Sequence, residues 1–298
     1  MTENISLFFN SLEGAFAENT IRAYKSDFAH YDEWCRENQV QTDKLNGQQM
    51  ASYVESMGDT LSTATIRRRV ASLSRIFKLM GQTDPTQATE VILTLKRLHR
   101  KFGRLQKQAT PLTQDILKKL IATCSKDIVG YRNKVLLRLG YETMRRRSEI
   151  CSFRFEDIKH LPNQNVALIL RHSKTDQYGD GKLIPISDEL LKLILKWKQV
   201  ANLDQGYILR AFHRNHHVRD KLNPAAINKI LKELQRKARM TDMEQLSGHS
   251  FRVGAAVDML DQGIPLERIM LRGGWKSENT AMKYLRNWQD HWVYNEQL

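Results

Sequence analysis

The residues of this sequence best suited to chemistry are basic and aromatic side chains in its second half. They are Arg146 with Glu149, Lys174, His249 with Arg252, Trp275 and Tyr284. A guanidinium stays charged and offers a planar, two-pronged donor that fits phosphate oxygens, and lysine and histidine can carry protons. Singly, each residue also has an ordinary explanation: a solvated arginine run, a charged hairpin tip, a helix cap, a core tryptophan or a buried helical tyrosine.

Four short motifs contain these residues in a fixed order. Residues 146–150 read Arg-Arg-Ser-Glu-Ile and precede the pair Asp157-Ile158; residues 173–175 read Ser-Lys-Thr. Residues 247–256 contain the pattern His-x-x-Arg. The last motif is Gly-Gly-Trp at 273–275, with a tyrosine nine residues after the tryptophan.

In this order and spacing, the motifs resemble those of the tyrosine recombinase (phage integrase) superfamily. The resemblance is greatest to Cre-type site-specific DNA recombinases, which have a tryptophan where Xer-type enzymes have a second histidine. It implies an enzyme that cleaves and rejoins DNA strands through a 3′-phosphotyrosyl intermediate and a Holliday junction. Such enzymes act as tetramers on two duplex sites and need neither cofactor nor metal.

The resemblance also implies a role for each residue. Tyr284 is the nucleophile, and Lys174 on a hairpin is the general acid for the leaving 5′ oxygen. Glu149 orients basic groups. The groups that stabilise the charge of the transition state are Arg146, His249, Arg252 and Trp275.

Two other functions and one question of register stay open. The same chemistry serves a type IB topoisomerase-like enzyme that relaxes DNA, and a sequence-specific DNA-binding protein can have lost catalysis. The first arginine motif departs from the family pattern, since Arg145 and Arg147 flank Arg146 where the family has apolar or small residues. We assign Arg146 by its spacing to Glu149; its neighbours either touch the DNA backbone or are solvated at the surface.

Composition points to a polyanionic partner. The net charge is +14 over 298 residues, which favours nucleic acid before an anionic membrane. No apolar run is long enough to span a bilayer, and the N-terminus lacks a signal-peptide pattern. The three cysteines, Cys35, Cys124 and Cys151, are far apart, which argues against a disulfide framework. We expect a cytoplasmic, nucleoid-associated bacterial protein without a membrane partner.

Hydrophobic periodicity predicts a mainly α fold with a small β-sheet in the second domain. In the N-terminal third it predicts a bundle of four helices: one from Thr20 with Asn19 as its N-cap, one after Asn46, one from Ser62 or Thr63, and one over residues 88–98.

In the second part, two short apolar runs at 166–170 and 183–186 flank a polar, glycine-bearing segment, which predicts a β-hairpin. Helices are expected around it at residues 113 onward, 127–143, 188–200, 224–240, 249–262, 265–272 and 278–284.

Residues 96–107 become basic and lose the apolar stripe, as expected of a linker that crosses a phosphate surface. We expect a helical DNA-binding (core-binding) domain at 1–103, a basic linker at 104–110 and a catalytic domain with a tail helix at 111–298. The residues expected to contact double-stranded DNA are Arg22, Lys25, Arg67, Arg68, Arg69 and Lys107. The alternative for them is a solvated helix face.

The tail after Tyr284 is half apolar, with Trp288, Trp292, Val293 and Leu298. The resemblance implies that it docks on a neighbouring protomer of a homotetramer; packing on its own domain is the alternative. Some 15 residues precede the first expected helix, which leaves no room there for a separate arm-site-binding domain. The need for a partner recombinase or an accessory protein stays open.

Overall fold

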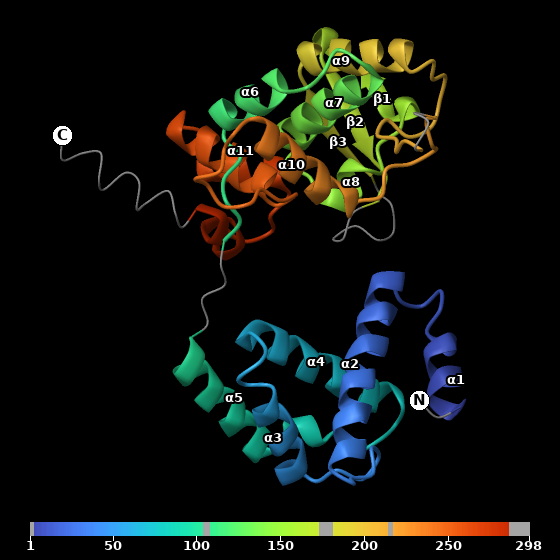
Figure 1. Ribbon diagram of the computed structural model, residues 1–298, viewed down its shortest axis with the longest axis vertical. Helices are drawn as coiled ribbons and strands as arrows, with labels where there is room; N and C mark the ends of the chain where they lie inside the picture. The colour runs from blue at the N-terminus through green and yellow to red at the C-terminus, as the bar shows by residue number, and fades with distance from the viewer. Residues whose placement is uncertain (1–2, 104–107, 173–180, 214–216, 286–298) are drawn as a thin grey trace, which may run out of the picture. The chain divides into compact units, whose positions relative to one another are not determined.

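The computed structural model describes residues 3–103, 108–172, 181–213 and 217–285. The chain divides into two compact units, Met1–Lys107 and Gln108–Leu298. Figure 1 shows the helices and strands of both units. Each unit has its own hydrophobic core. The expectation of a mainly helical protein with a small sheet in its second part is confirmed.

The N-terminal unit is a helical bundle with one more helix than expected. Its elements are α1 (Glu3–Ser11), α2 (Glu18–Glu37), α3 (Gly47–Ser56), α4 (Thr63–Leu79), the 3₁₀ turn η1 (Pro85–Gln87) and α5 (Thr89–Phe102). Asn46 and Ser62 cap α3 and α4 as predicted, because each side chain accepts a backbone N–H of the first turn. The prediction for Asn19 is wrong: α2 begins before it, and the N-cap residue is Ala17.

Aromatic side chains hold this bundle together. Tyr31 of α2 is fully buried and packs edge-to-face on Phe28, Tyr53 and Phe77. Such pairs add to the free energy of burial. The last helix, α5, continues past residue 98 and ends at Phe102. Part of the basic stretch at 96–107 is therefore helical, whereas the linker expected at 104–110 begins after this helix.

The C-terminal unit surrounds a three-stranded antiparallel sheet with helices. The sheet has the order β1-β2-β3, and Leu168 of β2 faces both Ile158 and Ile184. The strand β1 and the helix α8 were not predicted. The elements are α6 (Gln114–Ala122), α7 (Ile128–Thr143), α8 (Arg147–Ile150), η2 (Phe155–Asp157), β1 (Ile158–His160), η3 (Pro162–Gln164), β2 (Val166–Leu170), β3 (Lys182–Ile186), α9 (Asp188–Val200), α10 (Ala226–Lys237), α11 (Ser250–Asp261) and α12 (Leu266–Gly273).

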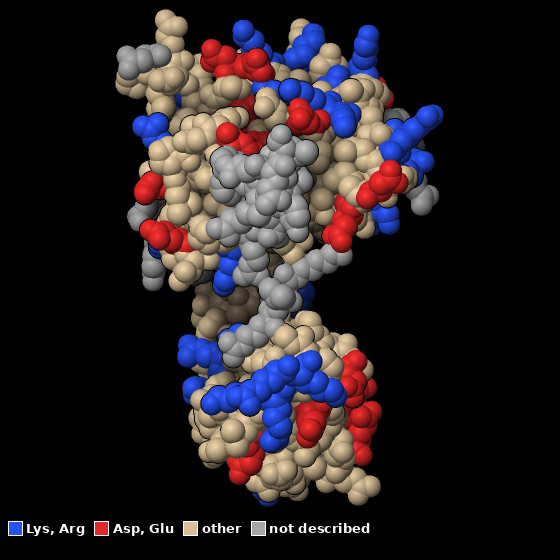
Figure 2. Space-filling model, turned by 90° about the vertical axis from the view of Figure 1, so that its left-hand side faces the viewer, with Lys and Arg blue, Asp and Glu red and all other residues tan. Residues whose placement is uncertain are grey.

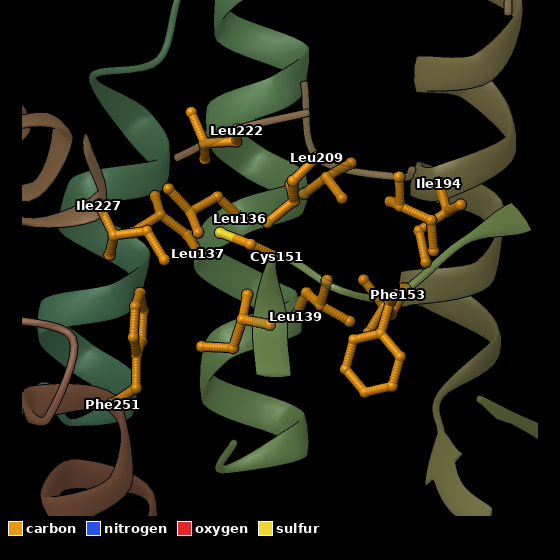
Figure 3. Close-up of a cluster of buried hydrophobic side chains, with 14 of the residues drawn as sticks. Leu136, Leu137, Leu139, Cys151, Phe153, Ile194, Leu209, Leu222, Ile227 and Phe251 are labelled. Atoms are coloured by element: carbon orange, nitrogen blue, oxygen red, sulfur yellow. The ribbon is translucent and has the colours of Figure 1, made fainter. Parts of the chain in front are cut away.

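Helix α7 is the centre of this unit. It is buried nearly all round, as at Val135, Leu136, Leu137 and Leu139, which is typical of a helix covered on every side. Figure 3 shows Leu136, Leu137 and Leu139 among side chains from the neighbouring elements. The C-terminal end of α7 is therefore held in a fixed place, and the candidate site begins there.

Two glycines let α11 lie close to its neighbours. A Cβ on Gly140 of α7 would lie 2.8 Å from the ring of Phe251. A Cβ on Gly254 of α11 would lie 1.9 Å from the carbonyl oxygen of Leu112. The Leu112 amide also donates to the carbonyl of Ser250 at 3.0 Å. Helix α11 is thus packed tightly between α7 and the segment that precedes α6.

Among the described residues, no helix combines the length and apolar character needed to cross a bilayer. The three cysteines are buried and free. Lys107, Lys174 and the tail residues Trp288, Trp292, Val293 and Leu298 lie outside the described residues.

Candidate active site

Arg252, on the first turn of α11, joins the ends of two other helices. Its side chain is 1% exposed. One Nη donates to the carbonyl of Met144 after α7, and the other donates to the carbonyl of Gly273 in α12 at 3.1 Å. Carbonyls at a helix C-terminus have no partner within the helix, so they are ready acceptors. The Nε of Arg252 is buried and has no partner among the described residues.

Trp275 and Tyr284 lie against this guanidinium. Their rings stack with centroids 4.7 Å apart and planes 25° apart. The Cζ of Arg252 is 5.2 Å from the centroid of Trp275 and 5.5 Å from that of Tyr284. Trp275 is buried, and its Nε1 has no partner among the described residues. Residues of two separate sequence motifs, Arg252 from one and Trp275 with Tyr284 from the other, are therefore in mutual contact.

The rings of Trp275 and Tyr284 pack in a small apolar cluster. It brings together α11, α12 and a helical stretch over residues 278–285. The amide side chain of Gln108 donates to the backbone carbonyl of Tyr284. This contact and the cluster fix the helical turn that bears Tyr284.

Arg146 and Glu149 form a second pair at the start of α8. The Nη1 of Arg146 lies 2.8 Å from one carboxylate oxygen, and its backbone N–H donates to the other at 3.0 Å. Burial alone would raise the pKa of Glu149, but these hydrogen bonds and the charges of Arg146 and Arg145 lower it below its usual range. Glu149 therefore stays ionised and holds Arg146 in one orientation.

His249 sits immediately before α11 in a cluster of positive charge. Partial removal of the imidazole from water lowers its pKa, as do the charges of Arg252, Arg147 and Arg146. Burial lowers the pKa of Arg252, and the charge of Arg146 lowers it further. Arg146, His249 and Arg252 therefore share one strongly positive region, and His249 is neutral at neutral pH.

The structure adds two arginines that sequence reasoning did not single out for the site. Arg145 is 3% exposed, so its interpretation as a solvated surface residue is wrong. Arg272, at the end of α12, is half-buried. Both donate to backbone carbonyls at the ends of α7 and α12. A run of three arginines does not reveal which one turns inward, because that depends on the chain reversal at Met144, which has φ 51°.

In the N-terminal unit, the three adjacent arginines of α4 differ in environment. Arg67 is exposed and makes no ion pair among the described residues. Arg68 grips the fully buried carboxylate of Asp27 with both Nη atoms, and Arg69 lies 3.6 Å from the same carboxylate with a side chain only 14% exposed. Figure 2 shows Lys and Arg side chains gathered on one face of this unit. On α2, Arg22 is exposed and Lys25 is half-buried.

Among the described residues, no group of three or more His, Cys, Asp or Glu side chains is arranged to hold a metal ion. A separate cavity of about 650 Å³ opens between α7, β3, α11 and α12. Its lining combines apolar side chains, among them Met144, Leu183, Met259 and Leu271, with charged side chains such as Glu142, Asp258 and Arg268.

Comparison with known proteins assigns the class. Residues 110–291 match the model of the phage integrase family, and residues 5–81 match its N-terminal SAM-like domain. The chain belongs to the phage integrase family, the tyrosine recombinases, as its motifs indicated.

Individual relatives agree with this assignment. The chain is 27% identical over 285 residues to an integrase/recombinase xerD homolog of Selenomonas ruminantium, covering 92% of this chain and 83% of the relative. It is 26% identical over 295 residues to recombinase cre of Escherichia phage P1, covering 92% of this chain and 85% of that protein. Both Xer-type and Cre-type enzymes are therefore among its relatives.

Solved structures share the fold. XerH recombinase bound to palindromic difH substrate in a post-cleavage complex aligns with a TM-score of 0.69 and 17% identity, over 93% of this chain and 79% of that one. A lambda integrase fragment, crystallised as a dimer bound to a core site, aligns with a TM-score of 0.66 and 16% identity, over 94% and 93%.

Proposed function

We propose that this protein is a site-specific DNA recombinase that uses Tyr284 to form a 3′-phosphotyrosyl intermediate. One observation carries the proposal: Arg252 lies over the stacked rings of Trp275 and Tyr284, and the buried Nε of Arg252 and Nε1 of Trp275 lack partners among the described residues. Buried donors without partners are rare in folded proteins and disfavour folding. Phosphate oxygens are acceptors of the kind that these donors lack.

The reaction that fits these groups is an exchange of phosphate esters. The Oη of Tyr284 attacks phosphorus and loses its proton, the bond to the 5′ oxygen breaks, and that oxygen takes up a proton. The energy of the broken ester is kept in the new one. A 5′ hydroxyl of another strand then reverses the step, which joins the strands and yields a Holliday junction.

The surrounding residues divide the remaining work. Arg146, Arg252 and Trp275 donate to the nonbridging oxygens, where negative charge grows in the transition state. His249 is neutral at neutral pH because its pKa is lowered, so its imidazole can accept a proton as well as donate a hydrogen bond. Lys174 protonates the 5′ oxygen, and Glu149 holds Arg146 in place.

Binding of the duplex involves both parts of the chain in this proposal. Residues 1–103 are the core-binding domain, 104–110 a basic linker and 111–298 the catalytic domain. Arg67 is the strongest candidate of the N-terminal contacts, because it is exposed and makes no ion pair among the described residues. The other proposed contacts are Arg22, Lys25, Arg68, Arg69 and Lys107.

We further propose that the enzyme acts as a tetramer linked by its tails. The cavity between α7, β3, α11 and α12 includes the exposed apolar side chains of Leu183 and Leu271 among its lining residues. The half-apolar sequence of the tail, with Trp288 and Trp292, suits the apolar part of that lining. A DNA substrate of this kind also fits the bacterial nucleoid as the site of action.

The test is covalent attachment to a nicked suicide substrate made from DNA next to the gene. Wild type should give a covalent band on a denaturing gel, and Tyr284→Phe should bind equally well but give none. Tyr207→Phe, which alters a tyrosine outside the site, is the matched control and should behave as wild type.

Other outcomes point to the alternatives. Persistent attachment in Tyr284→Phe would contradict the assignment of the nucleophile. Tight binding without any covalent product favours a catalytically silent DNA-binding protein. Relaxation of supercoiled DNA by a monomer, without a defined site, favours a type IB topoisomerase-like enzyme.

A further inference from the structure

Arg145, Arg252 and Arg272 form a set of contacts that we name the arginine clasp. Arg145 donates from Nε to the carbonyl of Thr143 at 2.8 Å and from Nη2 to the carbonyl of Arg272. Arg272 donates from Nε to the carbonyl of Glu142 at 2.8 Å. Arg252 donates to carbonyls on both sides, as described above. The three guanidiniums thus connect the C-terminal end of α7 to that of α12 by hydrogen bonds.

The clasp offsets the electrostatic repulsion between two helix C-termini. A helix C-terminus carries a partial negative charge of roughly half an electron, so two such ends placed together repel each other. Guanidinium groups between them supply positive charge and satisfy the unpaired carbonyls. This accounts for the presence of arginine at 145, a position where the sequence departs from the family pattern.

The clasp also shapes the turn that carries Trp275. Gly274 has a φ of +65°, and a Cβ there would lie 2.7 Å from the Nη1 of Arg145. The guanidinium of Arg145 therefore lies directly against the backbone of the turn. With one nitrogen on the carbonyl of Arg272, it holds the segment that leads from α12 to Trp275.

No carboxylate forms an ion pair with the clasp among the described residues, although Glu149 and Glu142 act on its charges at longer range. Among the described residues, neither Arg145, Arg252 nor Arg272 has a carboxylate oxygen within 4.0 Å. Burial, followed by the charge of Arg252, lowers the pKa of Arg145 to about 10, so Arg145 stays charged at neutral pH. Carbonyls supply hydrogen bonds but leave the net charge in place, and that charge remains available to a phosphate.

We propose that Arg145 and Arg272 are positioning residues for strand cleavage: they fix Arg252 and Trp275 in the geometry that receives the scissile phosphate. The inference rests on the proposed function, in which Arg252 donates to that phosphate. Neither residue needs to touch DNA. Both act by holding the two helix ends and the intervening turn in register.

The experiment compares Arg145→Met and Arg272→Met with a matched control, Arg132→Met. Arg132 is a buried arginine of α7 that donates to the backbone carbonyl of Arg210. Burial lowers its pKa to about 10 as well. Its removal therefore reproduces the loss of a buried cation from the C-terminal unit without removing a contact of the clasp. Arg272 is half-buried, so its variant remains informative if Arg145→Met folds poorly.

Two measurements separate positioning from loss of stability. The first is the single-turnover rate of strand cleavage at saturating substrate, below the melting temperature of each variant. The second is the ratio of this rate between a phosphodiester and a methylphosphonate at the scissile position, where one nonbridging oxygen is replaced by methyl. A misplaced Arg252 should lower the cleavage rate of the charged phosphodiester more than that of the neutral methylphosphonate, because the methylphosphonate has less negative charge for the guanidinium to stabilise.

We expect both clasp variants to bind DNA as wild type does and to cleave the phosphodiester 10- to 100-fold more slowly, on the order of the effect of a small misplacement of a catalytic group. Their phosphodiester-to-methylphosphonate ratio should fall. Arg145→Lys, which keeps the charge and one donor, should recover part of the rate. Arg132→Met should lose stability but keep the wild-type ratio.

The proposal is overturned if both clasp variants cleave at the wild-type rate. It is equally overturned if they slow both substrates by the same factor as Arg132→Met, since that indicates a merely structural role. A wild-type protein that cleaves neither substrate would contradict the proposed function itself, and the inference would fall with it.

Discussion

At the scale of single residues, the site is defined by how its charges are satisfied. Arg146 is paired with a buried carboxylate, whereas Arg252 is held by backbone carbonyls. The first arrangement fixes a side chain at the expense of its net charge, and the second keeps the charge intact. The two arginines expected to bind phosphate are therefore not electrostatically equivalent, although the motif treats them alike.

Glu149 makes the stability of the protein depend on pH. Because its pKa is lowered on folding, it stabilises the fold fully above its unfolded pKa of about 4.3 and loses that effect as the pH falls through the lowered value. Glu149→Gln should destabilise the protein at pH 7 by about 1.5 to 3 kcal/mol, as for hydrogen bonds to a charged group.

Thermal unfolding at a series of pH values checks this expectation. The difference in Tm between wild type and Glu149→Gln should be large at pH 7 and shrink as the pH drops below 4. Glu267→Gln, at an exposed position of α12, serves as control and should follow wild type. A difference that stays constant down to pH 3 would contradict the role given to the ionised carboxylate.

The sequence identifies the residues of the candidate site better than it predicts the contacts between them. The motifs contain Arg146, Glu149, His249, Arg252, Trp275 and Tyr284, and the structure brings the last three into contact. Arg145 could not be found in this way. Its burial follows from a left-handed residue at Met144, and nothing in the local pattern of a methionine before three arginines requires that reversal.

At the scale of elements, long amphipathic segments were predictable and short ones were not. The helix at 188–200 was predicted with its observed bounds, because a serine cap and a regular apolar spacing mark it. Strand β1 has only three residues, too few for an alternating pattern. Helix α1 has nine residues, and its two buried apolar positions, Ile5 and Phe9, are too few to mark a periodic stripe.

The close packing of α11 predicts the result of adding one methyl group. Gly254→Ala should destabilise the C-terminal unit by about 1 to 3 kcal/mol or more, because its Cβ meets backbone atoms of Leu112, which have little freedom to move. Gly140→Ala meets the ring of Phe251 instead and should be less harmful. Denaturant unfolding followed by circular dichroism measures both, and the reverse order would show that the segment around Leu112 yields more easily than the core.

At the scale of the whole molecule, the chain divides into two units with separate hydrophobic cores. The N-terminal unit buries an aspartate, Asp27, under the arginines of α4. These arginines therefore belong to the interior as well as to the surface. Only Arg67 of the three is exposed without an ion pair among the described residues, so the run of basic residues seen in the sequence is not one uniform DNA-binding face.

Arg67 and Arg68 should consequently differ when each is replaced by alanine. Arg67→Ala should leave Tm unchanged and lower the slope of log K against log salt by about 0.9, the loss of one phosphate contact. Arg68→Ala should destabilise the unit by about 1 to 3 kcal/mol, because it removes hydrogen bonds to a buried carboxylate, although the Arg68 side chain is half exposed and Arg69 remains nearby. Arg36→Ala, at an arginine paired with Asp32, is the control for the slope. Equal melting temperatures for the Arg67 and Arg68 variants would contradict this division.

The hydrogen bond from Gln108 to the backbone of Tyr284 bears on how chimaeric proteins of this kind should be built. Gln108 is the first residue of the C-terminal unit, yet it contacts the very residue assigned as nucleophile. A fusion protein can join a foreign DNA-binding domain to this unit. If the junction lies after Gln108, the hydrogen bond to the backbone of Tyr284 is lost. The graft should therefore end upstream of Gln108, so that the exchange of one module leaves the other with all of its own parts.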